Sequence, residues 1–98
     1  MPVIYEYLGI VIRLYVHDHE PIHIHAEYGD NAMKVSLLLK DGKIYRTTYS
    51  EEKGSFSPAK LKQLKEFVSQ YKYAMVYAWN QIVVNNVKVK KMTITKKI

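Results

Sequence analysis

The chain has no cysteine among its 98 residues, and this absence excludes several kinds of chemistry. Disulfide bonds, thiolate metal sites and thiol nucleophiles all need the missing side chain. No apolar run approaches the roughly 20 residues of a membrane span. The first residues also lack the basic segment followed by an apolar segment that is typical of a signal peptide. We therefore expect a cytoplasmic protein.

Acidic side chains are scarce in the second half of the chain. Residues 60–98 carry nine lysines and one acid, Glu66, which gives a net charge of +8, whereas residues 1–59 carry six Lys/Arg against eight Asp/Glu, which gives −2. This asymmetry favours an anionic partner for the C-terminal part, with nucleic acid first and an acidic protein second. A solvated lysine face that only aids solubility explains the same pattern.

The length and composition indicate one globular domain over residues 1–98. Apolar residues make up 48% of the chain and charged residues 24%, which separates it from disordered sequences. Apolar and polar residues alternate over Ile10–Val16, Ile22–Tyr28 and Met33–Leu39, which predicts β-strands there, and we expect one further strand before and one after these three. The expected strands are Ile4–Tyr7, Ile10–Val16, Ile22–Tyr28, Met33–Leu39 and Lys43–Tyr49, with a loop over Ser50–Ser55. Asp41-Gly42 is a hairpin signal, since both positions tolerate positive φ.

The second half changes to a helical period. Ser57-Pro58 has the residue types of an N-cap and a first helical position. Apolar residues then recur at spacings of three and four, namely Leu61, Leu64, Val68 and Tyr71. We expect a second helix from about Tyr73 to Ile82 and a C-terminal strand within Val87–Thr95. The predicted class is therefore α+β: a small, mostly antiparallel sheet followed by two helices and that last strand.

All four histidines lie between positions 17 and 25. In a strand over Ile22–Tyr28, the side chains of His23, His25 and Glu27 share one face, while the apolar residues take the other. Matching the apolar faces of the second and third strands places Tyr15 opposite His23 and Arg13 opposite His25. The sequence thus predicts Arg13, Tyr15 and the two histidines on one polar surface.

Two kinds of chemistry fit that surface. General acid–base cleavage of a phosphodiester needs a proton acceptor, a proton donor and a cation, which the catalytic candidates supply. These candidates are His19, His23, His25, Arg13 and Tyr15. Alternatively, His23 and His25 could bind a divalent transition metal such as zinc, with Glu27 or His19 completing the site. In a purely structural interpretation, the histidines are polar-face residues that tolerate water, and Arg13 and Tyr15 form ordinary cross-strand contacts.

Two segments carry a family resemblance. The chain opens Met-Pro-Val-Ile and continues Gly9-Ile-Val-Ile-Arg, and residues 18–29 read Asp-His-Glu-Pro-Ile-His-Ile-His-Ala-Glu-Tyr-Gly. The pattern resembles the small bacterial proteins of domain-of-unknown-function family 4160. The motif positions are Asp18, His19, Pro21, His23, His25, Glu27, Tyr28 and Gly29. His17 departs from the family, which more often has a polar residue such as Asn there.

The resemblance implies a partner rather than an activity. Family members resemble components of toxin–antitoxin modules, so a second small protein encoded alongside is the implied partner. Three hypotheses follow: a toxin-like effector acting on RNA, a protein- or nucleic-acid-binding module without chemistry, and a metal-binding protein. The aromatic content and an exposed edge strand also make a homo-oligomer a possible state.

Overall fold

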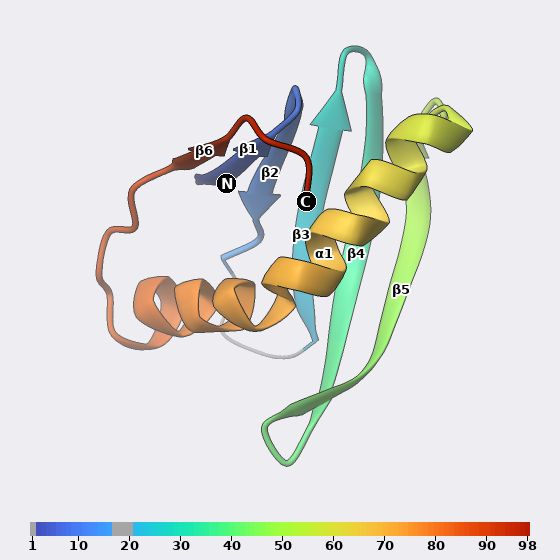
Figure 1. Ribbon diagram of the computed structural model, residues 1–98. Coiled ribbons are helices and arrows are strands. Elements are labelled where there is room, and N and C mark those ends of the chain that lie inside the picture. The colour runs from blue at the N-terminus through green and yellow to red at the C-terminus, as the bar shows by residue number, and fades with distance from the viewer. Residues whose placement is uncertain (1, 17–20) are drawn as a thin grey trace.

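A six-stranded sheet with one long helix across one of its faces forms the fold (Figure 1). The computed structural model describes residues 2–16 and 21–98. Its strands are β1 (Val3–Tyr7), β2 (Ile10–Leu14), β3 (Ile22–Tyr28), β4 (Asn31–Lys40), β5 (Lys43–Lys53) and β6 (Met92–Ile94). The sheet order is β5-β4-β3-β2-β1-β6, with antiparallel neighbours throughout except for the parallel pair β1 and β6. The predicted α+β class is confirmed.

Tight turns connect β1 to β2, β3 to β4 and β4 to β5. The turn between β4 and β5 has φ values of 53° at Asp41 and 78° at Gly42, so the predicted hairpin is confirmed. Gly29 turns the chain between β3 and β4 with φ of 58°. In the sheet, β1 to β5 lie side by side in chain order.

The helix begins where the sequence predicted. The Ser57 side chain accepts a hydrogen bond from the Lys60 backbone N–H at 3.2 Å, and Pro58 is the first residue of α1 (Pro58–Trp79). The prediction of a separate second helix is wrong. No Gly or Pro interrupts the chain after Tyr71, so α1 continues to Trp79 and ends in a π-helical turn, η1 (Asn80–Val84).

Several other boundaries differ from the expected ones: β1 begins at Val3, β2 ends at Leu14 instead of Val16, and β4 extends from Asn31 to Lys40. β5 runs to Lys53, so the loop predicted over Ser50–Ser55 is wrong for its first four residues. All four of these residues are polar, so no alternation of apolar and polar side chains marks them as a strand. The predicted C-terminal strand is confirmed only as the three residues of β6, which pair with β1.

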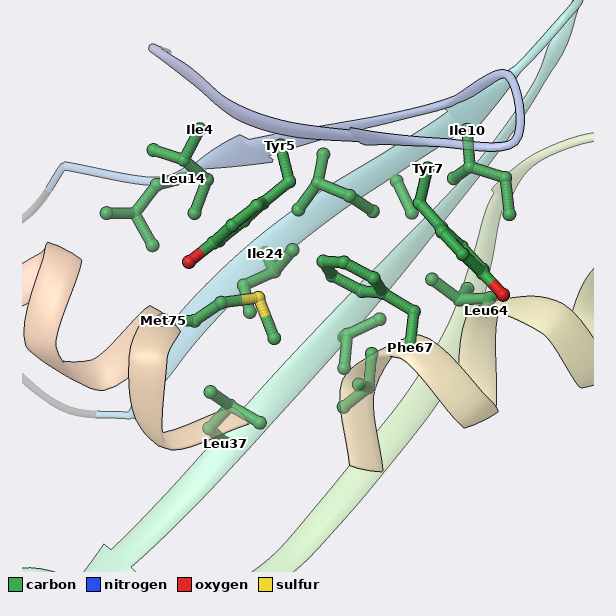
Figure 2. Packing of buried hydrophobic residues seen from close by; sticks show 14 of the residues in the cluster. Ile4, Tyr5, Tyr7, Ile10, Leu14, Ile24, Leu37, Leu64, Phe67 and Met75 are labelled. Atoms are coloured by element: carbon green, nitrogen blue, oxygen red, sulfur yellow. The ribbon is translucent and has the colours of Figure 1, made fainter. Parts of the chain in front are cut away.

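The core lies between α1 and the inner face of the sheet, as Figure 2 shows for Tyr7, Phe67 and Met75. The Phe67 ring is fully buried and stacks on Tyr71 with 4.8 Å between ring centroids and on Tyr7 with 5.3 Å. Tyr5 meets Phe67 edge-on at 5.3 Å. Aromatic rings therefore fill the space between the helix and β1, as a thin core requires.

The opposite face of the sheet has no helix over it in the described part of the chain (Figure 1). We call this surface the open face. Ile22, Ile24 and Ala26 of β3 point to the core, so the side chains between them lie on the open face. Within the described residues, no helix is both long and apolar enough to cross a membrane.

Candidate functional site on the open face

The strand register brings the predicted site residues together. Arg13 of β2 pairs with His25 of β3, and the Tyr15 backbone N–H donates to the His23 carbonyl at 3.0 Å. The predicted alignment of these four residues is confirmed. It follows from the match of Ile12 and Leu14 to the apolar side chains of β3, because a slip of one residue would turn the histidines into the core.

Arg13 is held by an acid of the neighbouring strand. Its Nε donates to Glu27 Oε1 at 2.8 Å, and each side chain is 35% exposed. This hydrogen bond is the main reason why the pKa of Glu27 lies below its ordinary value, with smaller contributions from the charges of Arg13 and His25. Glu27 is therefore ionised at neutral pH, and it competes with any anionic ligand for the Arg13 guanidinium.

His25 lies between two carboxylates. Its Nδ1 is 2.9 Å from Glu52 Oε1, and its Nε2 is 3.6 Å from Glu27 Oε2. Since an ionised carboxylate only accepts hydrogen bonds, Nδ1 carries the proton in the bond to Glu52. A histidine whose Nδ1–H is fixed by a carboxylate has a defined ring orientation, and its Nε2 is the atom that exchanges protons.

Glu52 is the site residue that the sequence argument missed. β5 has an irregular register between the pairs Ala32–Lys53 and Met33–Glu51, so Glu52 is an extra residue that opposes no residue of β4. The bulge brings its carboxylate over the open face to His25, 27 positions earlier in the chain. Period-two reasoning cannot find such a residue, because a bulge breaks the period.

Tyr15 completes the network. Its hydroxyl donates to both oxygens of Glu52, at 3.3 and 3.2 Å. The centroid of its ring lies 6.1 Å from that of His23 and 6.3 Å from that of His25, both in edge-to-face geometry. Burial, followed by the nearby Glu52 charge, raises the pKa of the Tyr15 hydroxyl. Tyr15 therefore stays protonated at neutral pH and acts as a hydrogen-bond donor.

His23 has a partner of a different kind. Its Nδ1 is 2.8 Å from the Ser36 hydroxyl of β4, and the two residues are directly paired across the strands. Ser36 was also missed from the sequence, since its position opposite His23 becomes visible only when the β3–β4 register is known. Among the described contacts, Nδ1 of His25 therefore meets a carboxylate and Nδ1 of His23 meets a hydroxyl.

His17, Asp18, His19 and Glu20 lie outside the described residues. The predicted catalytic role of His19 therefore stays a prediction. For the proposed metal ligands His23, His25 and Glu27, the described residues 2–16 and 21–98 contain no group of three His, Cys, Asp or Glu side chains that could hold an ion. The two ring nitrogens of His25 are directed at different carboxylates, an arrangement unlike the convergent donors of a zinc site.

The lysines of α1 do not flank the histidines. α1 covers the inner face of the sheet, so Lys62 and Lys65 lie on the side of the molecule away from the open face. Lys60 is held by the Leu8 carbonyl at 2.8 Å and lies over the Tyr28 ring. On the open face, two cationic residues pair with His25: Arg13 from β2 and Lys34 from β4.

The fold and this face define a class of small α+β proteins in which a histidine-bearing sheet surface lies opposite a single long helix. The chain belongs to the family described as domain of unknown function DUF4160, whose model matches residues 9–80. The match covers every described side chain of the network on β2, β3 and β4, as well as Glu52. Neither the curated proteins nor the solved structures contain a match.

Proposed function

We propose that the chain is the RNA-directed component of a toxin–antitoxin-like module and that its open face carries out acid–base cleavage of RNA. The observation that supports this best is the 2.9 Å contact between His25 Nδ1 and Glu52 on an uncovered face. A carboxylate that fixes a histidine ring is the usual arrangement for a histidine that transfers protons. The module itself rests on the family resemblance.

The chemistry assigns one step to each histidine. His25 Nε2 removes the proton of a ribose 2′-hydroxyl, and the 2′-oxygen attacks the adjacent phosphorus. The bond from phosphorus to the 5′-oxygen breaks, and protonated His23 returns a proton to that oxygen. The products are a 2′,3′-cyclic phosphate and a 5′-hydroxyl end. Glu52 stabilises the His25 imidazolium that forms, while Lys34 supplies positive charge toward the phosphate.

A second candidate is a nucleic-acid-binding module without chemistry, which the lysine distribution favours. Five lysines of the second half have neither an acidic partner nor a ring contact among the described residues: Lys62, Lys88, Lys90, Lys96 and Lys97. Unpaired lysines on α1 and the C-terminal segment suit phosphate contacts on the helix side. This candidate predicts affinity that falls about tenfold or more between 50 and 200 mM salt, with no dependence on His25.

RNA cleavage by untagged protein distinguishes the two candidates. Single-stranded RNA is incubated without metal, and the ends are analysed for 2′,3′-cyclic phosphate. We expect cleavage by the wild type and a loss of at least 100-fold in His25→Ala, because general acid–base catalysis contributes about 10²–10⁴-fold. Ser50→Ala is the matched control, since Ser50 is exposed on the same face opposite Lys34 and has no side-chain partner in the described structure.

Two results would count against catalysis. Equal cleavage by wild type and His25→Ala would identify a contaminating nuclease, and binding without cleavage would favour the second candidate. Thermal melts of each variant separate loss of activity from loss of fold.

A further inference from the structure

A small apolar pocket lies near the β4–β5 hairpin, and Leu38 of its lining shares the open face with the histidines. It has a volume of about 190 Å³ and is lined by Pro21, Leu38, Leu39 and Tyr45. His23 pairs with Ser36 and Ile22 with Leu37. Pro21 and Leu38 are therefore the next opposed positions along the two strands. Leu38 is two residues from Ser36 on β4, which puts it on the open face about 7 Å away along the strand.

Tyr45 gives this pocket an available aromatic surface. The side chain belongs to the extra residue of a second bulge, since Leu38 pairs with Arg46 and Leu39 with Ile44. The residue is 63% exposed and has no ring contact or hydrogen bond of its side chain in the described structure. Because the ring is neither buried nor paired, it contributes little to the stability of the core. It is therefore available to contact a ligand in the pocket.

Positive charge stands at the edge of the pocket. Arg46 is exposed, lies directly opposite Leu38 and has no acidic partner among residues 2–16 and 21–98. Arg13, in contrast, is engaged by Glu27. The Arg46 guanidinium is therefore not held by a carboxylate of the described residues, whereas that of Arg13 is.

We propose that this pocket binds one base of a single-stranded RNA, stacked on Tyr45, with the adjoining phosphate between Arg46 and His23. The inference deepens the proposed function and rests on it. The pocket is smaller than the roughly 300–1,000 Å³ of sites for drug-sized ligands, so it suits one flat ring system. A base offers an apolar face to Tyr45 and Leu38, and the separation along the strand leaves room for the sugar between the pocket and His23.

The test measures binding of a labelled single-stranded oligonucleotide that carries 2′-deoxy sugars, so that no cleavage occurs. We expect Tyr45→Ala to weaken binding by about 5- to 150-fold, the range for loss of one stacked base, and Tyr45→Phe to retain it. Tyr77→Ala is the matched control, because Tyr77 is 66% exposed but lies on α1, across the sheet. Replacing one base by an abasic unit is expected to weaken wild-type binding and to leave Tyr45→Ala unchanged.

The alternatives give different results. If the wild type binds RNA while Tyr45→Ala and the abasic oligonucleotide bind as tightly as their parents, the base pocket is wrong and the proposed function stands. If the wild type binds no RNA at low salt, both are wrong. If Tyr77→Ala weakens binding as much as Tyr45→Ala, the contact is a general aromatic one and the pocket is not its site.

Discussion

Glu52 offers the sharpest perturbation of the network, because one carboxylate holds both His25 and Tyr15. Glu52→Gln keeps the size of the side chain and removes the charge that stabilises an imidazolium. The amide can still accept a hydrogen bond from one of the two partners. We therefore expect the fold to survive and proton transfer by His25 to be impaired.

The expected size of the effect on kcat follows from the exposure of the Glu52 side chain and from its contacts. The Glu52 side chain is 33% exposed, so solvent screening reduces its electrostatic contribution below that of a buried pair. Partners that hold the ring of a metal-bound histidine contribute about 10- to 100-fold, and we expect the same range for Glu52. We predict a fall of that size in kcat for RNA cleavage, with KM changed by less than about threefold, since the Glu52 carboxylate is engaged by His25 and Tyr15.

Glu51→Gln is the matched control for this prediction. Glu51 is the neighbouring residue, carries the same charge, is exposed and has no ion pair within the described structure. Steady-state kinetics of the two variants, with thermal melts, provide the measurement. Equal effects of the two substitutions, or an effect of Glu52→Gln on KM alone, would refute the positioning role of Glu52.

Three further predictions concern the stability of the domain. Phe67→Ala removes a fully buried ring stacked between two tyrosines and should cost about 3–5 kcal/mol, seen as a loss of roughly 12 °C or more in Tm; a loss under about 4 °C would contradict this core. Gly54→Ala should cost about 1–2 kcal/mol in urea unfolding, because Gly54 has φ of +58° and an added Cβ meets the Asn31 side chain. The lowered pKa of Glu27 stabilises the fold above the unfolded-state pKa of about 4.3, and this contribution is lost as pH falls through the folded-state pKa. The Tm difference between wild type and Glu27→Gln should therefore be largest at neutral pH and shrink below about pH 4, and a difference independent of pH would exclude this linkage.

Alternation of side chains was enough to predict much of the open face. β3 has the predicted bounds, and the pairing of Arg13 with His25 follows from matching two apolar faces. These features depend on the period of a regular strand, which the sequence displays directly. The N-terminus of α1 was equally predictable, since Ser57-Pro58 carries a capping signal that acts within one turn.

The features that escaped prediction depend on irregular or long-range structure. Glu52 reaches His25 only through a bulge, and Tyr45 reaches its pocket through a second bulge. Neither bulge has a marker in the sequence, because non-glycine residues occupy both positions. The continuity of α1, in contrast, was missed although the sequence displays it: Met75 and Ala78 continue the spacing of three and four residues beyond Tyr71.

The proposed function depends most directly on whether His25 transfers protons in RNA cleavage. The decisive measurement is the rate of formation of 2′,3′-cyclic phosphate ends by untagged wild type and His25→Ala, prepared in parallel and shown to have the same fold by circular dichroism. We predict cleavage by the wild type and a rate at least 100-fold lower for His25→Ala. Equal rates, or no cleavage by the folded wild type, would contradict the acid–base function.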